Sequence, residues 1–275
     1  MASIKSNFFG LAIRAFVSVL PPVVVVRSLR IIRRRFGNDA LSILRERGQY
    51  SAAACLLEKQ MAYRVGRFLE KKDVCATSRV SLRAPVLIAG PTRIGKSRLA
   101  QRVAEQLDCR VISTDELRPI YLNPALPKDA AKEAKGYVYR ATLSSKCGVI
   151  LEGDALISDH YLKGAYGLEP YRVDLHRAVS LARECDAALI LIGSEDRDWV
   201  MENLSVDPGW AASVPPSDLA DFASVILDAS RELRVKAAAR SLIYFELSEY
   251  ACGDPVKKVS EEICQYVRYR GLRRS

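Results

Sequence analysis

A glycine-bounded turn that ends in a lysine and a serine carries the strongest chemical signal in the sequence. It reads GPTRIGKS and matches the pattern G-x-x-x-x-G-K-[S/T]. Its two glycines, Gly90 and Gly95, let the main chain turn so tightly that its N–H groups converge on phosphate oxygens. Lys96 brings a positive charge to the β- and γ-phosphates, and the hydroxyl of Ser97 is a ligand for Mg²⁺. The turn therefore predicts a site for a nucleoside triphosphate.

We expect the whole turn and the residue after it to contact the nucleotide, with ATP and Mg²⁺ as the ligands. The helix that follows the turn points its positive N-terminus at the same phosphates. The candidate binding residues are Gly90, Pro91, Thr92, Arg93, Ile94, Gly95, Lys96, Ser97 and Arg98.

A second group of candidate residues follows the apolar run CRVIS, in the sequence STDELR. Parallel strands present their carboxyl ends to the ligand crevice, so Asp115 is expected where an acceptor hydroxyl meets the γ-phosphate. A carboxylate there can orient that hydroxyl and accept its proton. Arg118, one helical turn later, can pair with an anionic group of the substrate. Asp115 is also a candidate N-cap for the helix, and it can play both roles. We take Asp115, Lys96 and Arg118 as the candidate catalytic residues.

A third strand is expected in CGVILEGDALIS, and it ends in two acids. The sequence leaves open which of Glu152 and Asp154 faces the crevice. We favour Glu152, which with Ser97 would hold the metal.

The elements that must position these residues alternate between strands and helices. Apolar runs at 85–89, 109–113, 147–152, 186–193 and 241–248 predict strands, with helical patterns between them. The run at 85–89 lacks a polar alternation, as is typical of a parallel strand buried on both faces. We therefore expect a three-layer α/β fold, the P-loop NTPase fold, with a parallel sheet of about five strands.

Three domains are predicted. Residues 1–38 form a basic apolar segment, 39–80 a helical hairpin and a linker, and 81–275 the P-loop domain. The net charge of the chain is +10, and residues 1–38 contain seven basic residues and no acid, which leaves +3 for the rest. The body therefore does not indicate a sequence-specific nucleic-acid partner. Residues 1–38 have three open interpretations: a membrane anchor or interfacial helix, a cleaved organellar transit peptide, or a helix packed on the body.

The cysteines indicate a reducing compartment, for which we expect the cytoplasm, with any membrane association made through residues 1–38. There are seven, an odd number, and no C-x-x-C pair. This pattern argues against a disulfide framework and against a zinc site.

From about Val86 to Val267 the chain resembles the P-loop small-molecule kinases, with zeta-toxin-type and 2-phosphoglycerate-kinase-like enzymes as the nearest types. The matching segments are GPTRIGKS, VISTDELR, VILEGD, LILIGS and ASRELRVKAAARSLIYFELS, in that order. Enzymes of this group place an aspartate and a nearby arginine at the acceptor site, which Asp115 and Arg118 match. The resemblance implies transfer of the γ-phosphate of ATP to a hydroxyl of a small molecule or nucleotide-sugar.

The sequence departs from this group at the lid, which should bring an arginine over the phosphates. The segment SVDPGWAASVPPSDLADFAS contains no arginine. Only Arg197 before it, or Arg231 or Arg234 after it, could neutralise the charge that develops during transfer.

Two other functions stay open. The segment GPTRIGKS…VISTDELRPIY is also similar to isopentenyl transferases that act on adenine, in which the aspartate would deprotonate an amine and the loop would bind a prenyl diphosphate. The lid without arginine and the basic N-terminus would instead suit a non-catalytic or regulatory nucleotide-binding module at a membrane.

Overall fold

The chain divides into two compact units in the computed structural model. The first consists of Met1–Val74 and Leu117–Thr142, and the second of Cys75–Glu116 and Leu143–Ser275. The sequence does not predict that 117–142 groups with the first unit, and the three domains expected from it stay a prediction. The structure describes residues 15, 17, 19–28, 44–45, 50–72, 84–122, 128–145, 148–158, 172–206, 215–247 and 254–272.

The first unit contains helix α4 (Tyr50–Lys71), most of α6 (Thr114–Tyr121) and nearly all of α7 (Lys128–Leu143). Helix α4 buries Leu57, Met61, Val65 and Leu69, which are spaced four residues apart and so share one face. On α6 and α7, the rings of Tyr121 and Tyr139 meet edge to face at 6.1 Å. The predicted hairpin at 39–80 is thus described mainly by its second helix, α4.

Most of residues 1–38 and the linker at 73–83 lie outside the described residues, and the three interpretations of the N-terminal segment stay predictions. Where the structure describes the chain, no helix combines the length and the apolar character needed to cross a membrane.

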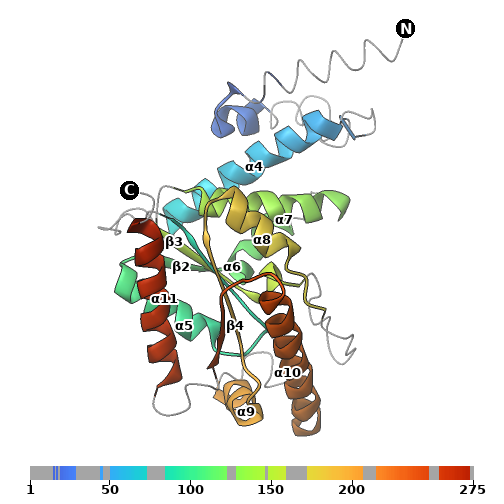
Figure 1. The fold of residues 1–275 in the computed structure, drawn as a ribbon. Helices are drawn as coiled ribbons and strands as arrows, with labels where there is room; N and C mark the ends of the chain where they lie inside the picture. The colour runs from blue at the N-terminus through green and yellow to red at the C-terminus, as the bar shows by residue number, and fades with distance from the viewer. Residues whose placement is uncertain are drawn as a thin grey trace. The chain divides into compact units, whose positions relative to one another are not determined.

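The second unit is built on a parallel sheet in the order β2-β3-β1-β4-β5 (Figure 1). The strands are β1 (Val86–Ala89), β2 (Arg110–Ser113), β3 (Val149–Glu152), β4 (Ala188–Gly193) and β5 (Tyr244–Glu246). All four residues of β1 are fully buried, as expected for a central strand covered on both faces. The neighbours of β1 are β3 on one side and β4 on the other, so the crevice beyond its carboxyl end is a topological switch point.

Helices cover both faces of this sheet. On one face, alternate strand residues such as Ile88, Ile150 and Ile190 share a hydrophobic core with α5, α9, α10 and α11. The intervening residues, such as Leu87 and Leu189, are buried on the other face, where α8 packs against β1 and β4. The bounds of these helices are Lys96–Leu107 for α5, His176–Glu184 for α8, Arg197–Val206 for α9, Pro216–Ala238 for α10 and Pro255–Leu272 for α11. The predicted three-layer α/β fold is confirmed.

The loop after β1 passes unusually close to β4. A Cβ atom added at Gly90 would lie 2.2 Å from the backbone carbonyl oxygen of Ile192 and 2.8 Å from Cδ1 of Ile94. Backbone atoms cannot rotate away as a side chain can, so only glycine fits at this position.

We therefore expect Gly90→Ala to lower the free energy of unfolding by about 1–3 kcal/mol, the usual cost of overpacking, or by more because the opposing atom is backbone. Urea denaturation followed by circular dichroism measures this change. The matched control is Gly66→Ala in α4, where an added Cβ meets nothing within 4 Å. The control should be stabilised by about 0.5–1 kcal/mol. An unchanged denaturation midpoint for Gly90→Ala would contradict the close approach.

Candidate functional site

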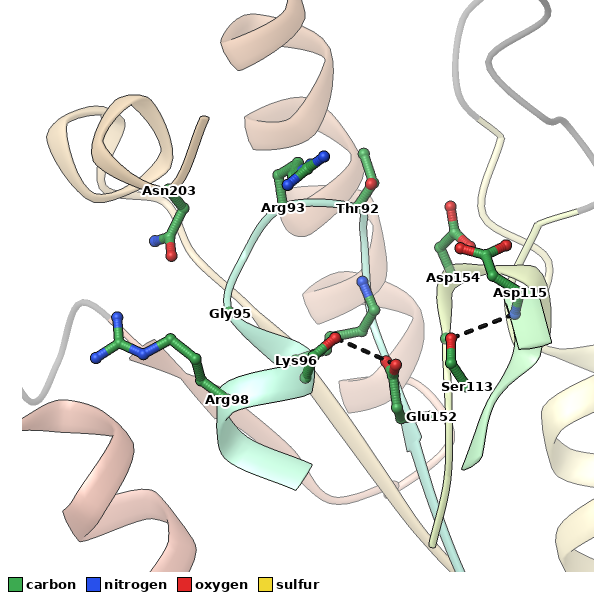
Figure 2. Close-up of a pocket in the computed structure, with 12 residues that line it drawn as sticks. Thr92, Arg93, Gly95, Lys96, Arg98, Ser113, Asp115, Glu152, Asp154 and Asn203 are labelled. Carbon is green, nitrogen blue, oxygen red and sulfur yellow. Dashed lines mark hydrogen bonds between the residues drawn. The ribbon is translucent and has the colours of Figure 1, made fainter. Parts of the chain in front are cut away.

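A cavity of about 350 Å³ lies where the phosphate loop meets the carboxyl ends of β2 and β3 (Figure 2). All of its lining residues belong to the second unit. They are Thr92, Arg93, Gly95, Lys96, Ser97, Arg98, Ser113, Asp115, Glu152, Gly153, Asp154 and Asn203.

The phosphate loop has the strand–loop–helix form that the sequence predicts. Strand β1 ends at Ala89, and α5 begins at Lys96, immediately after Gly95. The ammonium of Lys96 is largely buried and donates a hydrogen bond of 2.5 Å to the carbonyl oxygen of Pro91, inside the loop. The first N–H groups of a helix have no partner within the helix, so the start of α5 beside this cation suits an anion.

Six of the nine predicted nucleotide-binding residues line the cavity: Thr92, Arg93, Gly95, Lys96, Ser97 and Arg98. The other three, Gly90, Pro91 and Ile94, do not line it but shape the loop.

The two predicted metal ligands lie together. The hydroxyl of Ser97, on the first turn of α5, donates a hydrogen bond of 3.2 Å to Oε1 of Glu152, the last residue of β3. Glu152 is only 4% exposed, and its carboxylate reaches the cavity. A hydroxyl and a carboxylate are hard oxygen ligands of the kind Mg²⁺ prefers, and the cavity leaves room for the waters that this ion usually keeps. These residues therefore fit a magnesium ion.

Asp115 lines the cavity near the start of α6, and capping of this helix falls on other residues. The hydroxyl of Ser113 accepts a hydrogen bond from the N–H of Asp115 at 3.2 Å. The carboxylate of Glu116 in turn accepts one from the N–H of Ser113 at 3.2 Å. The arrangement is a variant of the S-x-x-E capping box, in which the N–H bonded to the serine hydroxyl is that of Asp115 instead of Glu116. The side chain of Asp115 is therefore exposed to the cavity rather than used as the N-cap.

Both acids at the end of β3 face the cavity, whereas the sequence left open which of them would. Glu152 closes the strand, and the chain turns at Gly153, so that Asp154 begins a short 3₁₀ helix, Asp154–Leu156. Glu152 and Asp154, on either side of this turn, both line the cavity.

The arginines predicted for the acceptor site and for the lid do not line the cavity. Arg118 is half-buried on α6 and is not among the residues that line the cavity, so its pairing with a substrate anion stays a prediction. Arg231 pairs with Asp228 at 3.0 Å and Arg234 with Glu195 at 3.3 Å, and neither arginine lines the cavity.

Two other arginines do line it, Arg93 and Arg98, both from the phosphate loop and its helix. Arg93 has a φ of 58°, in the left-handed region that costs a residue with a side chain about 1–2 kcal/mol. Residues in such conformations cluster at functional sites, where the surrounding structure holds them.

Helix α9 adds a site residue that sequence reasoning missed. Asn203 lines the cavity, and its Oδ1 would lie 3.9 Å from a Cβ added at Gly95. The indole N–H of Trp199, one turn earlier on the helix, donates a hydrogen bond of 3.2 Å to the carbonyl oxygen of Ile94. Helix α9 is thereby fixed to the phosphate loop. No motif marks Asn203, and only its place on this helix brings it to the loop.

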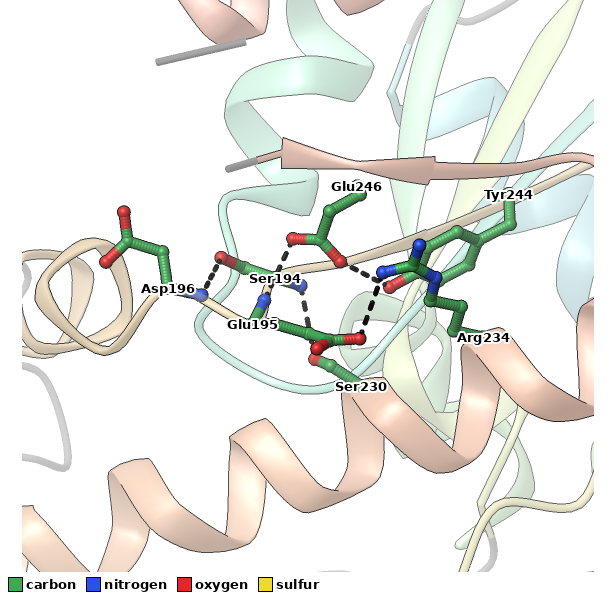
Figure 3. A network of polar contacts seen from close by, with 7 residues as sticks. All are labelled: Ser194, Glu195, Asp196, Ser230, Arg234, Tyr244 and Glu246. Atoms are coloured by element: carbon green, nitrogen blue, oxygen red, sulfur yellow. Dashed lines mark hydrogen bonds and ion pairs between the residues drawn. The ribbon is translucent and has the colours of Figure 1, made fainter. Parts of the chain in front are cut away.

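A partly buried polar network fixes the start of α9 (Figure 3). The carboxylate of Glu246, at the end of β5, accepts hydrogen bonds of 2.8 Å from the N–H of Glu195 and from the hydroxyl of Tyr244. Burial raises the pKa of Tyr244 above its ordinary value, and the negative charge of the adjacent Glu246 carboxylate raises it further. The Tyr244 hydroxyl therefore keeps its proton and remains a donor. Asp196 then caps α9, since its carboxylate accepts the N–H groups of Asp198 and Trp199 at 2.8 and 3.2 Å.

Comparison with known proteins gives limited likenesses, and no family model matches the chain. The chain is 28% identical over 180 residues to a tRNA dimethylallyltransferase of Rhodopseudomonas palustris, a match that covers 54% of this chain and 53% of that protein. It therefore spans about half the length of this curated relative.

Among solved structures, a gluconokinase of Sinorhizobium meliloti has a TM-score of 0.40 at 13% identity, over 70% of this chain and 94% of that one. A structure from the PezAT toxin–antitoxin system of Streptococcus pneumoniae has a TM-score of 0.37 at 14% identity, over 76% and 93% of the two chains. At these scores we draw no conclusion about reaction or substrate from either likeness.

The contact between α9 and the phosphate loop leads to a test. Trp199→Phe removes the hydrogen bond to Ile94 while keeping an aromatic ring, and a neutral hydrogen bond contributes about 0.5–1.5 kcal/mol. We expect the Kd for ATP to rise by about 2- to 10-fold, as measured by isothermal titration calorimetry. Ser205→Ala, an exposed change on the same helix, should leave the Kd unchanged. An unaltered Kd for Trp199→Phe would mean that this contact does not support the loop.

Proposed function

We propose that this protein is an ATP-dependent phosphotransferase that moves the γ-phosphate of ATP to a hydroxyl of a small molecule or nucleotide-sugar. One observation carries the proposal: a single cavity is lined by the phosphate loop, by the hydrogen-bonded pair Ser97 and Glu152, and by the exposed carboxylate of Asp115. A phosphate cradle, oxygen ligands for a metal and a proton acceptor are what phosphoryl transfer requires of a protein.

The roles follow from the chemistry of each group. Lys96 and the N–H groups of the loop bind the β- and γ-phosphates. Ser97 and Glu152 would hold Mg²⁺, which when bound supplies positive charge beside those phosphates. Asp115 orients the acceptor hydroxyl and takes its proton. The hydroxyl oxygen then forms a bond to the γ-phosphorus, the bond from that phosphorus to the bridging oxygen breaks, and ADP leaves.

We further propose that Arg93 takes the role of the lid arginine, which is to stabilise negative charge on the phosphates. It lines the cavity from within the phosphate loop, and its left-handed backbone is a conformation that glycine would adopt at no steric cost. The presence of an arginine at this position supports a need for its charge, which would stabilise the charge that develops on the transferred phosphoryl group.

A second candidate function is prenyl transfer, and the 28% identity to a tRNA dimethylallyltransferase favours it. In that case the phosphate loop would bind the diphosphate of a prenyl donor, and Asp115 would take a proton from an amine. The γ-phosphate of ATP would then have no role, which separates the two candidates by experiment.

The proposal is tested with the full chain, γ-labelled ATP, Mg²⁺ and a deproteinised metabolite extract from which nucleic acids have been removed. We expect a labelled product that is absent with Lys96→Ala, because this change removes the only cation buried inside the loop among the described residues. Asp115→Asn should bind ATP like the parent, but slow transfer by about 100- to 10,000-fold, because it removes the proton acceptor.

Other outcomes point elsewhere. ATP binding should raise the free energy of unfolding by about 2.7 kcal/mol when the ATP concentration is about a hundred times Kd. Such binding without any labelled product would contradict the kinase and favour a nucleotide-binding module. Transfer of the labelled prenyl group from dimethylallyl diphosphate to the amine of added adenine-containing RNA, with release of diphosphate, would instead establish the second candidate.

Arg93→Gly should change stability and the rate of transfer in different ways. Glycine adopts the left-handed conformation without steric strain, so the free energy of unfolding should stay unchanged or rise slightly. Loss of the charge should lower the rate of transfer at saturating ATP by about 100-fold or more. Arg93→Gln, which removes the charge but keeps the backbone strain, should lose the same rate without the gain in stability. Transfer by both variants at the parent rate would refute the role of Arg93.

A further inference from the structure

The cavity has two sides of opposite charge. The phosphate side carries the cations Arg93, Lys96 and Arg98. The other side is made by the ends of β2 and β3 and carries the carboxylates of Asp115 and Asp154. In Figure 2 both carboxylates are drawn on the side away from Asn203 and Arg98. Donor phosphates belong with the cations, so the acidic side is left for the acceptor.

Neither of these two carboxylates is neutralised within the described part of the chain. Capping of α6 is done by Ser113 and Glu116, so the carboxylate of Asp115 is not used for it. Asp154 contributes its backbone carbonyl oxygen to the following turn, where it accepts the N–H groups of Ile157 and Ser158 at 2.9 and 3.0 Å. No described cation forms an ion pair with either carboxylate.

Tight packing holds the two aspartates in place. Thr114, the neighbour of Asp115, lies against Gly153, the neighbour of Asp154: a Cβ added at Gly153 would come within 1.9 Å of Oγ1 of Thr114. Thr114 is 1% exposed, and its hydroxyl has no hydrogen-bond partner among the described residues. Buried hydroxyl groups without a hydrogen-bond partner are rare in native proteins, because they lower stability. The close approach of Thr114 to Gly153 puts the segments that bear the two aspartates in direct contact.

Resting on the proposed phosphotransferase function, we infer that the acceptor is an uncharged or cationic small molecule with at least two hydrogen-bond donors, such as a polyol, a sugar or an amino sugar. Ionised carboxylates only accept hydrogen bonds, so they select hydroxyl and amino groups. They also repel a carboxylate or phosphate on the acceptor, more strongly in a partly enclosed cavity than in water. This disfavours nucleotide-sugars and sugar acids as acceptors and so narrows the acceptors named in the proposed function to uncharged and cationic small molecules.

The experiment divides the deproteinised metabolite extract on an anion exchanger before the assay. The full chain is incubated with γ-labelled ATP, Mg²⁺ and either the unbound fraction, which holds neutral and cationic molecules, or the bound fraction, which holds anions. Lys96→Ala serves as the blank. We expect a labelled product from the unbound fraction. A product from the bound fraction alone would overturn this inference and leave the phosphotransferase standing. No product from the undivided extract would overturn the proposed function and the inference with it.

Once the labelled acceptor is identified, Asp154→Asn tests the contribution of the second carboxylate. We expect the KM for that acceptor to rise by about tenfold, while the Kd for ATP stays unchanged because Asp154 lies on the acceptor side. Asp198→Asn, an exposed change on α9 that does not line the cavity, is the matched control. An unchanged KM in Asp154→Asn would overturn the role of the acidic side.

Discussion

The close approach of two pieces of backbone is the constraint on which the site depends. The chain at Gly90 leaves the central strand so near to the carbonyl oxygen of Ile192 that no side chain fits between them. This contact sets where the loop turns, and the turn sets where α5 begins and where the ammonium of Lys96 lies. Because β1 lies between β3 and β4, the same contact brings the loop to the point where the strand connections diverge. The carboxyl end of β3, with its acids, is adjacent there.

Support for the loop comes from the other half of the sheet through a sequence of contacts. Glu246, at the end of β5, holds the chain after β4, Asp196 caps α9, and Trp199 connects that helix to Ile94. Each link is a hydrogen bond to a backbone group, so each one fixes the path of the main chain. A change at the buried end of β5 would therefore be transmitted to the phosphate loop through the backbone, although Glu246 does not line the cavity.

The predictable parts of the structure are those in which local sequence determines local geometry. The phosphate loop needs glycines and a lysine at fixed spacing, and buried parallel strands need short apolar runs, so both are visible in the sequence. The position of Asn203 is not visible in the sequence, because it depends on two long-range contacts. One joins Glu195 to Glu246, 51 positions apart, and the other joins Trp199 to Ile94, 105 positions apart. The acids after β3 are visible in the sequence, but that both line the cavity depends on the path of the chain at Gly153, which the sequence does not specify. Arg231 and Arg234 looked available in the sequence, whereas in the structure each pairs with a nearby acid.

The two units are not consecutive segments of the chain. The connection from β2 to β3 contains Leu117–Thr142, which belongs to the unit of the N-terminal residues, so the polypeptide crosses between the two units three times. A single cut of the chain after Val74 therefore does not separate the two units. A shorter version that began after Val74 would retain α7 but lose α4, and apolar side chains such as Val138 and Ala134 would be left without the rest of their unit.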